Sequence, residues 1–325
     1  MIDLRSFVDR VTAIVARHNL GAAGEYRRWL RPDEGVNPYG SADAANILYS
    51  IGRWPDAAVR AAWVDRLRAM QDAGSGLFEE ATHHPFHTTA HCVAALELFD
   101  ARPAHPLAAL HPLRQRAALE RFLDTLDWSW NPWGESHRGA GLYAALVLAG
   151  EVSMEWQDWY FDWLWKEADP ESGLWRRGHV QAGGESILFH HLAGSFHYLF
   201  NHEYARRPLR YPERLAATCL RIAAVGAFPF CQTVGFAEID WVYCLNRSVR
   251  QCGEHFAASR HALRDLAARY VAYLLGLDVE THEGLNDLHN LFGALCALAE
   301  LQQALPGELR TDPPLRLVLD RRPFI

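Results

Sequence analysis

Apolar residues recur at helical spacing along almost the whole chain, and no stretch alternates apolar and polar residues as a half-buried strand would. In the first 30 or so residues, for example, Phe7, Val8, Val11, Ile14 and Val15 fall on one helical face. The pattern therefore predicts an all-α fold.

Two kinds of helical segment alternate along the chain. The first kind is amphipathic, as in LRQRAALERFLDTL, and the second is apolar on nearly all sides and rich in small residues, as in GAGLYAAL and LFGALCAL. A helix that is apolar all round must be buried. These apolar segments begin near residues 41, 86, 136, 186, 237 and 286, which indicates a repeat of roughly 50 residues.

The repeat predicts a single domain of six helical hairpins, with an inner ring of apolar helices inside an outer ring of amphipathic ones. We expect the hairpins at about residues 1–54, 55–103, 104–153, 154–207, 208–253 and 254–305. The Pro-rich tail, residues 306–325, is expected to pack over the outside.

This organisation resembles the (α/α)6 toroid proteins over about residues 1–305. That superfamily includes six-hairpin glycosidases, N-acylglucosamine 2-epimerase-like isomerases, polysaccharide lyases, and terpene-cyclase and prenyltransferase toroids. The loop DPESGLW looks like loops of six-hairpin glycosidases, and LRAMQDAGSGLFEEATHHPFHTTAHCVAALEL is similar to a terpene-cyclase or prenyltransferase repeat. The DxDD motif of class II terpene cyclases and the Cys/Cys/His zinc pattern of lanthipeptide cyclases are not found in the sequence. The resemblance implies a pocket at the mouth to which the inner helices point their N-termini.

Composition narrows the class of protein further. Half of the residues are hydrophobic and the formal net charge is −7, so a large core is expected and a nucleic-acid partner is not. The six cysteines form no CxxC pair, which favours reduced thiols, and no charge-free apolar segment is long enough to span a membrane. We expect a cytoplasmic protein with a small-molecule or oligosaccharide substrate. The oligomeric state is left open.

Polar residues gather where the apolar segments begin, and nine of the 17 histidines fall in these short windows. His87 and His91 are four residues apart and share a helical face, the geometry of a two-histidine metal pair. The alternative is a polar pocket without metal, and no HExxH motif is present. No cofactor is therefore expected, with a divalent metal at this pair as the alternative.

Three carboxylates at the inner-helix starts suit glycosidic chemistry, which needs an acid and a base or nucleophile flanking the scissile bond. They are Glu135, Asp240 and Asp287, and each could instead cap a helix or pair with an arginine such as Arg138 or Arg247. The first hypothesis is thus a carbohydrate-active hydrolase or lyase that cleaves a short soluble saccharide.

Three other functions remain open. A sugar epimerase or isomerase would use two near-neutral groups on opposite faces of a carbon, and His197 and His289 could serve. A cyclase-like toroid would handle an isoprenoid in a deep, dry, aromatic cavity. A scaffold would keep the pocket without catalysis.

The remaining residues of the inner-helix starts and their loops are expected to bind the substrate. Flat aromatic rings stack on sugars or on carbocations, and polar side chains bond hydroxyl groups. The aromatic candidates are Tyr39, Trp128, Trp133, Trp175 and Trp241. The polar candidates are Asp43, His83, His84, His87, His91, His137, His190, His191 and Glu238.

Overall fold

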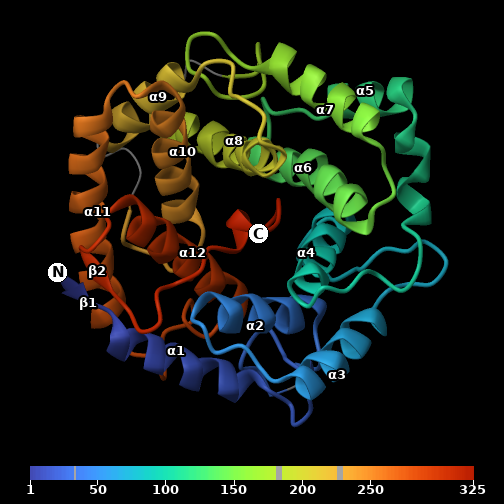
Figure 1. Ribbon diagram of the computed structural model, residues 1–325, viewed down its shortest axis with the longest axis vertical. Helices are drawn as coiled ribbons and strands as arrows, with labels where there is room; N and C mark the ends of the chain where they lie inside the picture. Colours follow the sequence, from blue (N-terminus) through green and yellow to red (C-terminus); the bar gives the residue numbers. More distant parts are fainter. Residues whose placement is uncertain (33, 181–184, 225–229) are drawn as a thin grey trace.

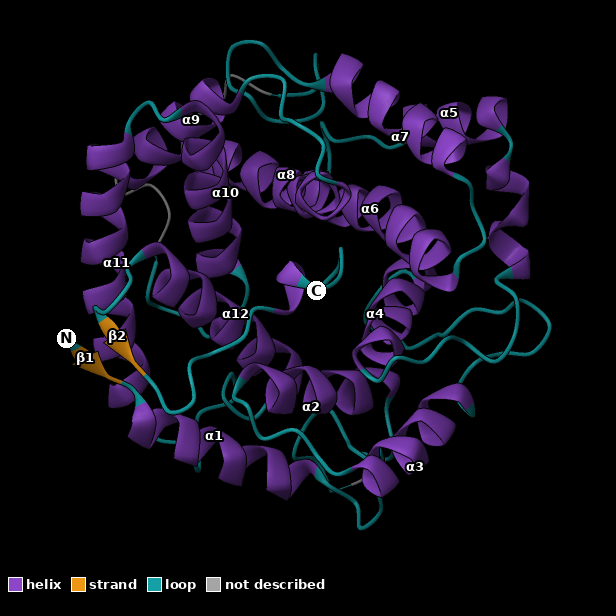
Figure 2. Ribbon diagram, in the orientation of Figure 1, coloured by secondary structure: helices purple, strands orange, loops and turns teal. Residues whose placement is uncertain are grey.

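The structure is a computed structural model that describes residues 1–32, 34–180, 185–224 and 230–325, without the side chains of residues 185 and 186. As the hydrophobic pattern predicted, the chain is all-helical, with twelve α-helices, α1 to α12, in the described residues. The strands there are β1 (Ile2–Asp3) and β2 (Leu309–Arg310), which pair in parallel with Ile2 opposite Leu309 (Figure 2).

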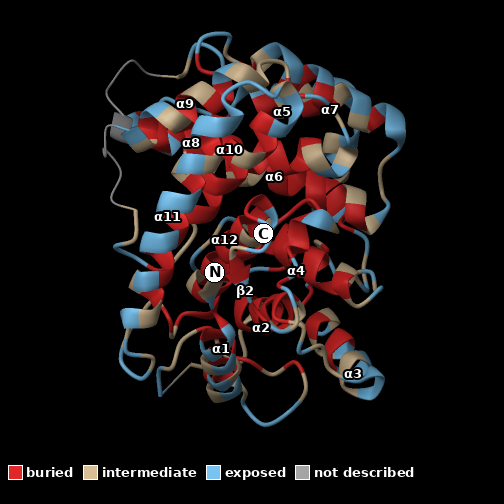
Figure 3. Ribbon diagram, turned by 60° about the vertical axis from the view of Figure 1, so that its left-hand side comes forward, coloured by how far each residue is buried: buried red, intermediate tan, exposed pale blue. Residues whose placement is uncertain are grey.

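The odd-numbered helices form the outer layer of the molecule (Figure 1). Each is amphipathic: the first of them buries Phe7, Val11 and Ile14 and exposes Asp9 and Ala13. Figure 3 shows that exposed residues lie on the outward sides of these helices, whereas the inner helices are mostly buried. The outer helices are α1 (Arg5–His18), α3 (Ala57–Arg68), α5 (Arg116–Asp124), α7 (Met154–Glu167), α9 (Pro212–Ala224) and α11 (Phe256–Gly276).

The even-numbered helices lie inside the outer layer and surround the centre of the molecule (Figure 1). Each contacts the next, and the last contacts the first, so the inner layer closes on itself. They are α2 (Pro38–Ser50), α4 (Pro85–Leu98), α6 (Pro132–Ala149), α8 (Glu185–Ala205), α10 (Ala237–Cys252) and α12 (Leu288–Ala304). Every one starts within four residues of the position that the repeat predicted.

Local sequence explains where several inner helices begin. Helices α2, α4 and α6 each start at a proline that follows a capping residue, namely Asn37, His84 and Asn131. The cap side chain accepts a backbone N–H that has no partner inside the helix, and proline needs no such partner. Asp287 caps α12 in the same way.

Glycines in the inner helices let two loops approach the centre. A Cβ at Gly40 would lie 2.5 Å from the backbone carbon of Arg27, and one at Gly293 would lie 2.7 Å from the carbonyl oxygen of Gly235. Any larger residue would push these loops outward. The two glycines therefore place Arg28 and Phe236 beside the inner-helix ends.

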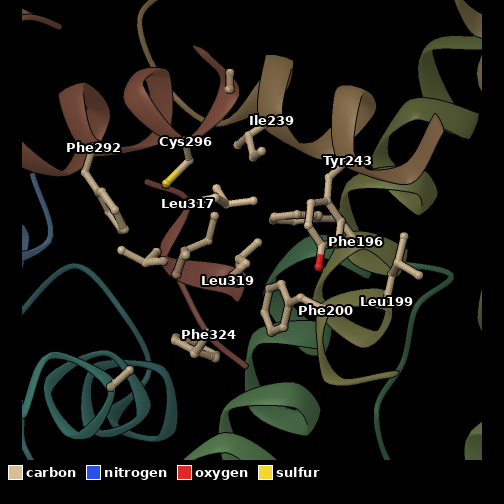
Figure 4. Close-up of a cluster of buried hydrophobic side chains, with 14 of the residues drawn as sticks. Phe196, Leu199, Phe200, Ile239, Tyr243, Phe292, Cys296, Leu317, Leu319 and Phe324 are labelled. Atoms are coloured by element: carbon tan, nitrogen blue, oxygen red, sulfur yellow. The ribbon is translucent and has the colours of Figure 1, made fainter. Parts of the chain in front are cut away.

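The C-terminal tail contradicts the expectation that it packs over the outside. After β2 the chain turns inward, forms the 3-10 helix η2 (Val318–Asp320) and ends in the middle of the inner ring (Figure 1). Figure 4 shows Leu317, Leu319 and Phe324 packed among side chains of α8, α10 and α12. The closed inner ring leaves an apolar centre, and the tail fills it because these apolar side chains gain more from burial than a surface position would give.

Several polar groups of the tail find hydrogen-bond partners inside the ring. The guanidinium of Arg322, fully buried, donates to the Asn46 side chain and to the Phe324 carbonyl oxygen. Asn201 of α8 donates to the Pro323 carbonyl oxygen at 3.0 Å. These bonds offset the cost of burying polar atoms and set the position of Phe324.

None of the helices in the described ranges combines the length and the apolar character that crossing a bilayer requires.

Candidate functional site

A cavity of about 340 Å³ lies against the first turns of α4, α6, α10 and α12 and the middle of α8. Five histidines line it, and we call it the histidine pocket: His83, His87, His137, His197 and His289. Arg28, Trp133 and Phe236 complete much of its wall. Among the described residues that line it there is no aspartate or glutamate.

The five histidine rings form one continuous series of contacts, the histidine arc. Ring centroids are 5.2 Å apart from His289 to His83, 4.8 Å from His83 to His87, 4.2 Å from His87 to His137 and 4.5 Å from His137 to His197. The arc therefore runs from α12 past the start of α4 and across α6 to α8.

Burial keeps most of the arc uncharged. It lowers the pKa of His197 to about 3 and that of His289 to about 4. Burial also lowers the pKa of His87 and His137 well below the ordinary value, and repulsion between neighbouring histidines adds to this. Near neutral pH these four imidazoles are neutral, so each presents one N–H donor and one lone pair.

Ser136 of α6 decides which nitrogen of His197 carries the proton. The Ser136 Oγ lies 2.6 Å from the Trp133 carbonyl oxygen and 2.8 Å from His197 Nδ1. Because the carbonyl can only accept, the hydroxyl donates to it and accepts the Nδ1–H of His197. The lone pair of His197 is then on Nε2, which makes this atom a candidate general base.

At the other end of the arc, Asp43 of α2 binds two histidines. Its Oδ1 lies 2.7 Å from His91 Nε2 and 3.3 Å from His289 Nδ1. Burial by itself would raise the pKa of Asp43, but the attraction and hydrogen bonds of His289 and His91 outweigh it and hold the pKa below the ordinary value. Neither Asp43 Oδ2 nor His91 Nδ1 has a hydrogen-bond partner in the described part of the chain.

These three residues form a candidate metal site. One ligand atom from each of Asp43, His91 and His289 lies within 4.8 Å of the other two. The i, i+4 spacing suggested a different pair, His87 with His91. In the structure their ring centroids are 6.4 Å apart, and the Nδ1 of His87 is instead hydrogen-bonded to the Tyr39 hydroxyl.

Tyr39 packs against several of the histidines of this region and fixes their orientation. Its ring stacks on His83 at 4.5 Å and on His91 at 4.7 Å and meets the edge of His289 at 4.7 Å. Burial raises the pKa of Tyr39 well above its ordinary value, so the phenol stays protonated. Tyr39 is thus a positioning residue for His83, His91 and His289.

The carboxylate of Asp287 accepts hydrogen bonds from four N–H groups. Arg28 binds it through Nε at 2.9 Å and through a terminal nitrogen at 3.1 Å, Trp29 Nε1 lies at 3.0 Å, and the backbone N–H of His289 lies at 3.0 Å. The pair is buried, and it attaches the loop that carries Arg28 to the start of α12. In this arrangement Asp287 is a helix cap and an ion-pair partner.

The other two predicted catalytic carboxylates also lie away from the lining of the histidine pocket. Glu135 pairs with Arg138 at 3.0 Å and faces a neighbouring, more open hollow that His84 and Trp133 also line. Asp240 is fully buried in α10, and within the described residues its carboxyl has no hydrogen-bond partner. Burial raises the pKa of Asp240 well above its ordinary value.

Only some of the residues that were predicted to bind the substrate line the histidine pocket. The structure brings His83, His87, His137 and Trp133 together there, with His197 and His289. It places Trp128, Trp175 and Trp241 in the hydrophobic core, where Trp175 and Trp241 donate to backbone carbonyls.

Four further residues that were predicted to bind the substrate lie outside the lining of the histidine pocket. His84 is exposed and caps α4, His190 is exposed, and His191 is buried beside Trp128, with ring centroids 6.4 Å apart. Glu238 is buried in the first turn of α10, where its Oε1 accepts the backbone N–H of Cys231 at 2.8 Å. The side chain of Glu185, which also lies at an inner-helix start, is outside the described residues.

The sequence gives no local signal for some of the residues that line the pocket. Arg28 and Phe236 lie in loops whose approach to the centre depends on distant glycines, so nothing local singled them out. Ile325 lines the pocket because the tail lies inside the ring. Ser136 did carry a signal: it is a polar residue between Glu135 and His137 at the start of an apolar helix.

The histidine pocket opens beside a larger groove of about 910 Å³. The two share Thr233, Val234 and Asn290 in their walls. Acidic residues, including Glu280 and Glu283, line the groove. The groove thus places acidic side chains next to the histidine pocket.

The fold and the site define a class: an all-helical protein with a histidine-lined cavity at the ends of a closed inner ring. Comparison of the chain with protein-family models, curated proteins and solved structures finds no match. The function is therefore inferred from the geometry of the pocket.

Proposed function

We propose that the two layers form an (α/α)6 toroid and that the protein is an enzyme that moves a proton at a carbon of a small sugar-like substrate, as an epimerase or isomerase does. The observation that carries the proposal is the histidine arc: His197 and His289 stand at its two ends and line one cavity. Both imidazoles are uncharged near neutral pH, so each has a lone pair with which it can accept a proton.

In this reaction, His197 Nε2 accepts the proton from a carbon next to the substrate's carbonyl group. The electron pair moves into the carbonyl oxygen, and the charge of Arg28, which lines the same cavity, stabilises it. His289 takes up a proton from water and delivers it to the same carbon from the other side, while the proton on His197 is released to solvent. Its Nδ1 is engaged by Asp43, which leaves Nε2 as the nitrogen that can meet the substrate.

The cavity suits a single sugar unit. Its volume of about 340 Å³ is at the lower end of small-molecule sites. Imidazole groups can donate to and accept from hydroxyls, while Trp133 and Phe236 offer flat faces for the apolar side of a sugar ring. These features favour a polar substrate over an isoprenoid, which would need a dry aromatic cavity.

Cleavage of a saccharide has less support at this pocket. Glycosidases need two carboxyl groups on either side of the scissile bond. The described lining of the histidine pocket contains none, and Asp287 is bound to Arg28. Hydrolysis therefore stays a prediction from the sequence, and the geometry favours proton transfer.

The test is to incubate the full-length protein with aldoses, ketoses and N-acylated hexosamines in deuterium oxide and follow them by NMR. We expect deuterium at the carbon next to the carbonyl group, without bond cleavage. His197→Gln should slow incorporation by about 10²–10⁴-fold, as loss of a general base does. His190→Gln, an exposed residue of the same helix, should change little. Release of reducing ends without exchange, or no exchange with any of these sugars, would count against the proposal.

A further inference from the structure

We propose that Asp43, His91 and His289 form a binding site for a divalent transition-metal cation of the zinc class. They come from three inner helices, α2, α4 and α12, and each is at most 6 % exposed. One ligand atom from each lies within 4.8 Å of the others.

The spacing of these atoms suits a metal. Ligand atoms bound tetrahedrally to Zn²⁺ at about 2.0–2.2 Å lie about 3.4 Å from one another. Here Asp43 Oδ1 lies 3.3 Å from His289 Nδ1 and 2.7 Å from His91 Nε2. The first distance already matches this spacing, the second would lengthen by about 0.7 Å, and the two histidine nitrogens lie within 4.8 Å of each other.

An unpartnered atom points to a missing ligand. Asp43 is fully buried, yet its Oδ2 has no hydrogen-bond partner within the described residues. Arg28 and Arg322 act on Asp43 only from a distance: Arg28 is bound to Asp287 and Arg322 to the Asn46 side chain. A buried carboxylate oxygen without a partner is costly, and a cation bound there would remove that cost.

The chemistry of the three ligands selects the kind of metal. Two imidazole nitrogens with one carboxylate oxygen suit Zn²⁺ and related first-row ions, whereas Mg²⁺ and Ca²⁺ prefer oxygen ligands alone. Metal binding requires imidazoles without charge, and both His91 and His289 are buried away from solvent.

Tyr39 supplies the outer support that such a site needs. Its ring packs on the face of His91 and against the edge of His289, with centroids 4.7 Å away in both cases. Second-shell contacts of this kind fix ring orientation and so increase metal affinity. The ion would connect α2 with α12, the first and last inner helices.

A metal at this site would also change which nitrogen of His289 carries its proton. The consequence for catalysis rests on the proposed function. With the ion on Nδ1, the proton of the neutral His289 ring is on Nε2, the nitrogen left for the substrate. His289 then presents a donor while His197 presents a lone pair, so the two ends of the histidine arc become a complementary acid and base. Without the metal, Asp43 accepts the Nδ1 proton and both ends present lone pairs.

Metal binding can be measured on the full-length protein without any substrate. After treatment with a chelator, the protein is titrated with Co²⁺ and, separately, with Zn²⁺ in a calorimeter. We expect one ion per chain, a visible Co²⁺ spectrum of low-symmetry coordination and a higher melting temperature with Zn²⁺. Mg²⁺ should produce none of these. In ¹⁵N NMR, Zn²⁺ should move the proton of His289 from Nδ1 to Nε2.

Variants locate the ion. Asp43→Asn, His91→Gln and His289→Gln should each weaken Zn²⁺ affinity by about 10²-fold or more, because even second-shell changes cost 10–100-fold. His202→Gln, a buried histidine of inner helix α8, should leave it unchanged. Failure of the folded wild-type protein to bind Zn²⁺ or Co²⁺, or equal binding by all four variants, overturns the site. Since these assays contain no sugar, this result is independent of whether deuterium exchange is found.

Discussion

Asp43 on α2 and His289 on α12 are 246 residues apart in the sequence, and their Oδ1 and Nδ1 atoms lie 3.3 Å apart in the structure. This hydrogen bond joins the first inner helix to the last and so belongs to the contact that closes the inner ring. It also fixes the ring nitrogen with which His289 can meet a ligand. The same pair of side chains therefore takes part both in the contact that closes the ring and in the candidate site.

Ser136→Ala should lower the proposed exchange activity by about 10-fold, the equivalent of one lost hydrogen bond. Without the Ser136 hydroxyl, nothing holds the proton of His197 on Nδ1, and Nε2 is no longer always the base. The measurement combines the deuterium-exchange rate with the ¹⁵N shifts of His197. Ser248→Ala is the control, because this buried serine bonds only backbone carbonyls of its own helix. An unchanged His197 tautomer in Ser136→Ala would contradict the assignment.

Arg28→Leu should lower the free energy of unfolding by about 3–5 kcal/mol, because it leaves the buried Asp287 carboxylate without its ion-pair partner. Urea unfolding followed by circular dichroism measures this. Adding Asp287→Asn to the same protein should restore part of the loss, since the charge is then gone. Arg264→Leu removes an exposed pair with Glu308 and should have a much smaller effect. Equal effects of the two single variants would contradict a structural role for the Arg28–Asp287 pair.

Phe324→Ala should lower the free energy of unfolding by about 3–5 kcal/mol, the usual cost of removing a buried aromatic side chain. The ring is fully buried and packs against His87 and Phe200, so its loss leaves a cavity in the centre of the ring. Phe256→Ala is the matched control, because that ring is 58 % exposed. If both variants unfold at the same urea concentration as the wild type, the tail does not occupy the centre.

Glu238→Gln should stabilise the protein at alkaline pH and change little at acidic pH. Burial raises the pKa of Glu238 to about 7 from an ordinary value of 4.5, so the folded protein binds this proton more tightly than the unfolded chain does. The stability it contributes is complete below about pH 4.5 and is lost as the pH rises to about 7.

At pH 8 the glutamine variant should therefore be more stable than the wild type by about 3 kcal/mol, since one pKa unit corresponds to 1.36 kcal/mol. Urea unfolding at pH 5 and pH 8 measures the difference, and the exposed Glu155→Gln serves as control. A gain of the same size at both pH values would show that burial of charge is not the cause.

The inner helices could be located from the sequence because their determinants are local. Apolar periodicity, small residues and pairs such as Asn37-Pro38 and Asn131-Pro132 mark their starts without any knowledge of distant contacts. The position of the tail could not be found in this way. Its apolar residues would suit an outer groove as well as the centre, and only the closed ring creates a centre to fill.

Part of the histidine pocket could be predicted from the sequence. Histidines at the inner-helix starts were expected to share a pocket, and four of the five that line it lie near such starts, whereas His197 lies in the middle of α8. Trp128, Trp175 and Trp241 look the same in the sequence as Trp133, since a ring that packs in a core and a ring that lines a pocket are equally apolar. Likewise, spacing grouped His87 with His91, whereas the structure groups His91 with Asp43.

By itself, then, the sequence determined the helices, their alternation and the ends at which polar groups collect, because hydrogen bonding within a helix and burial of one face act over a few residues. Only the tertiary structure decided which side chains meet: Asp43 with His289, Arg28 with Asp287, and Phe324 with His87. These contacts join segments far apart in the chain. Their geometry depends on how six helices pack into a closed ring, and no local pattern encodes that.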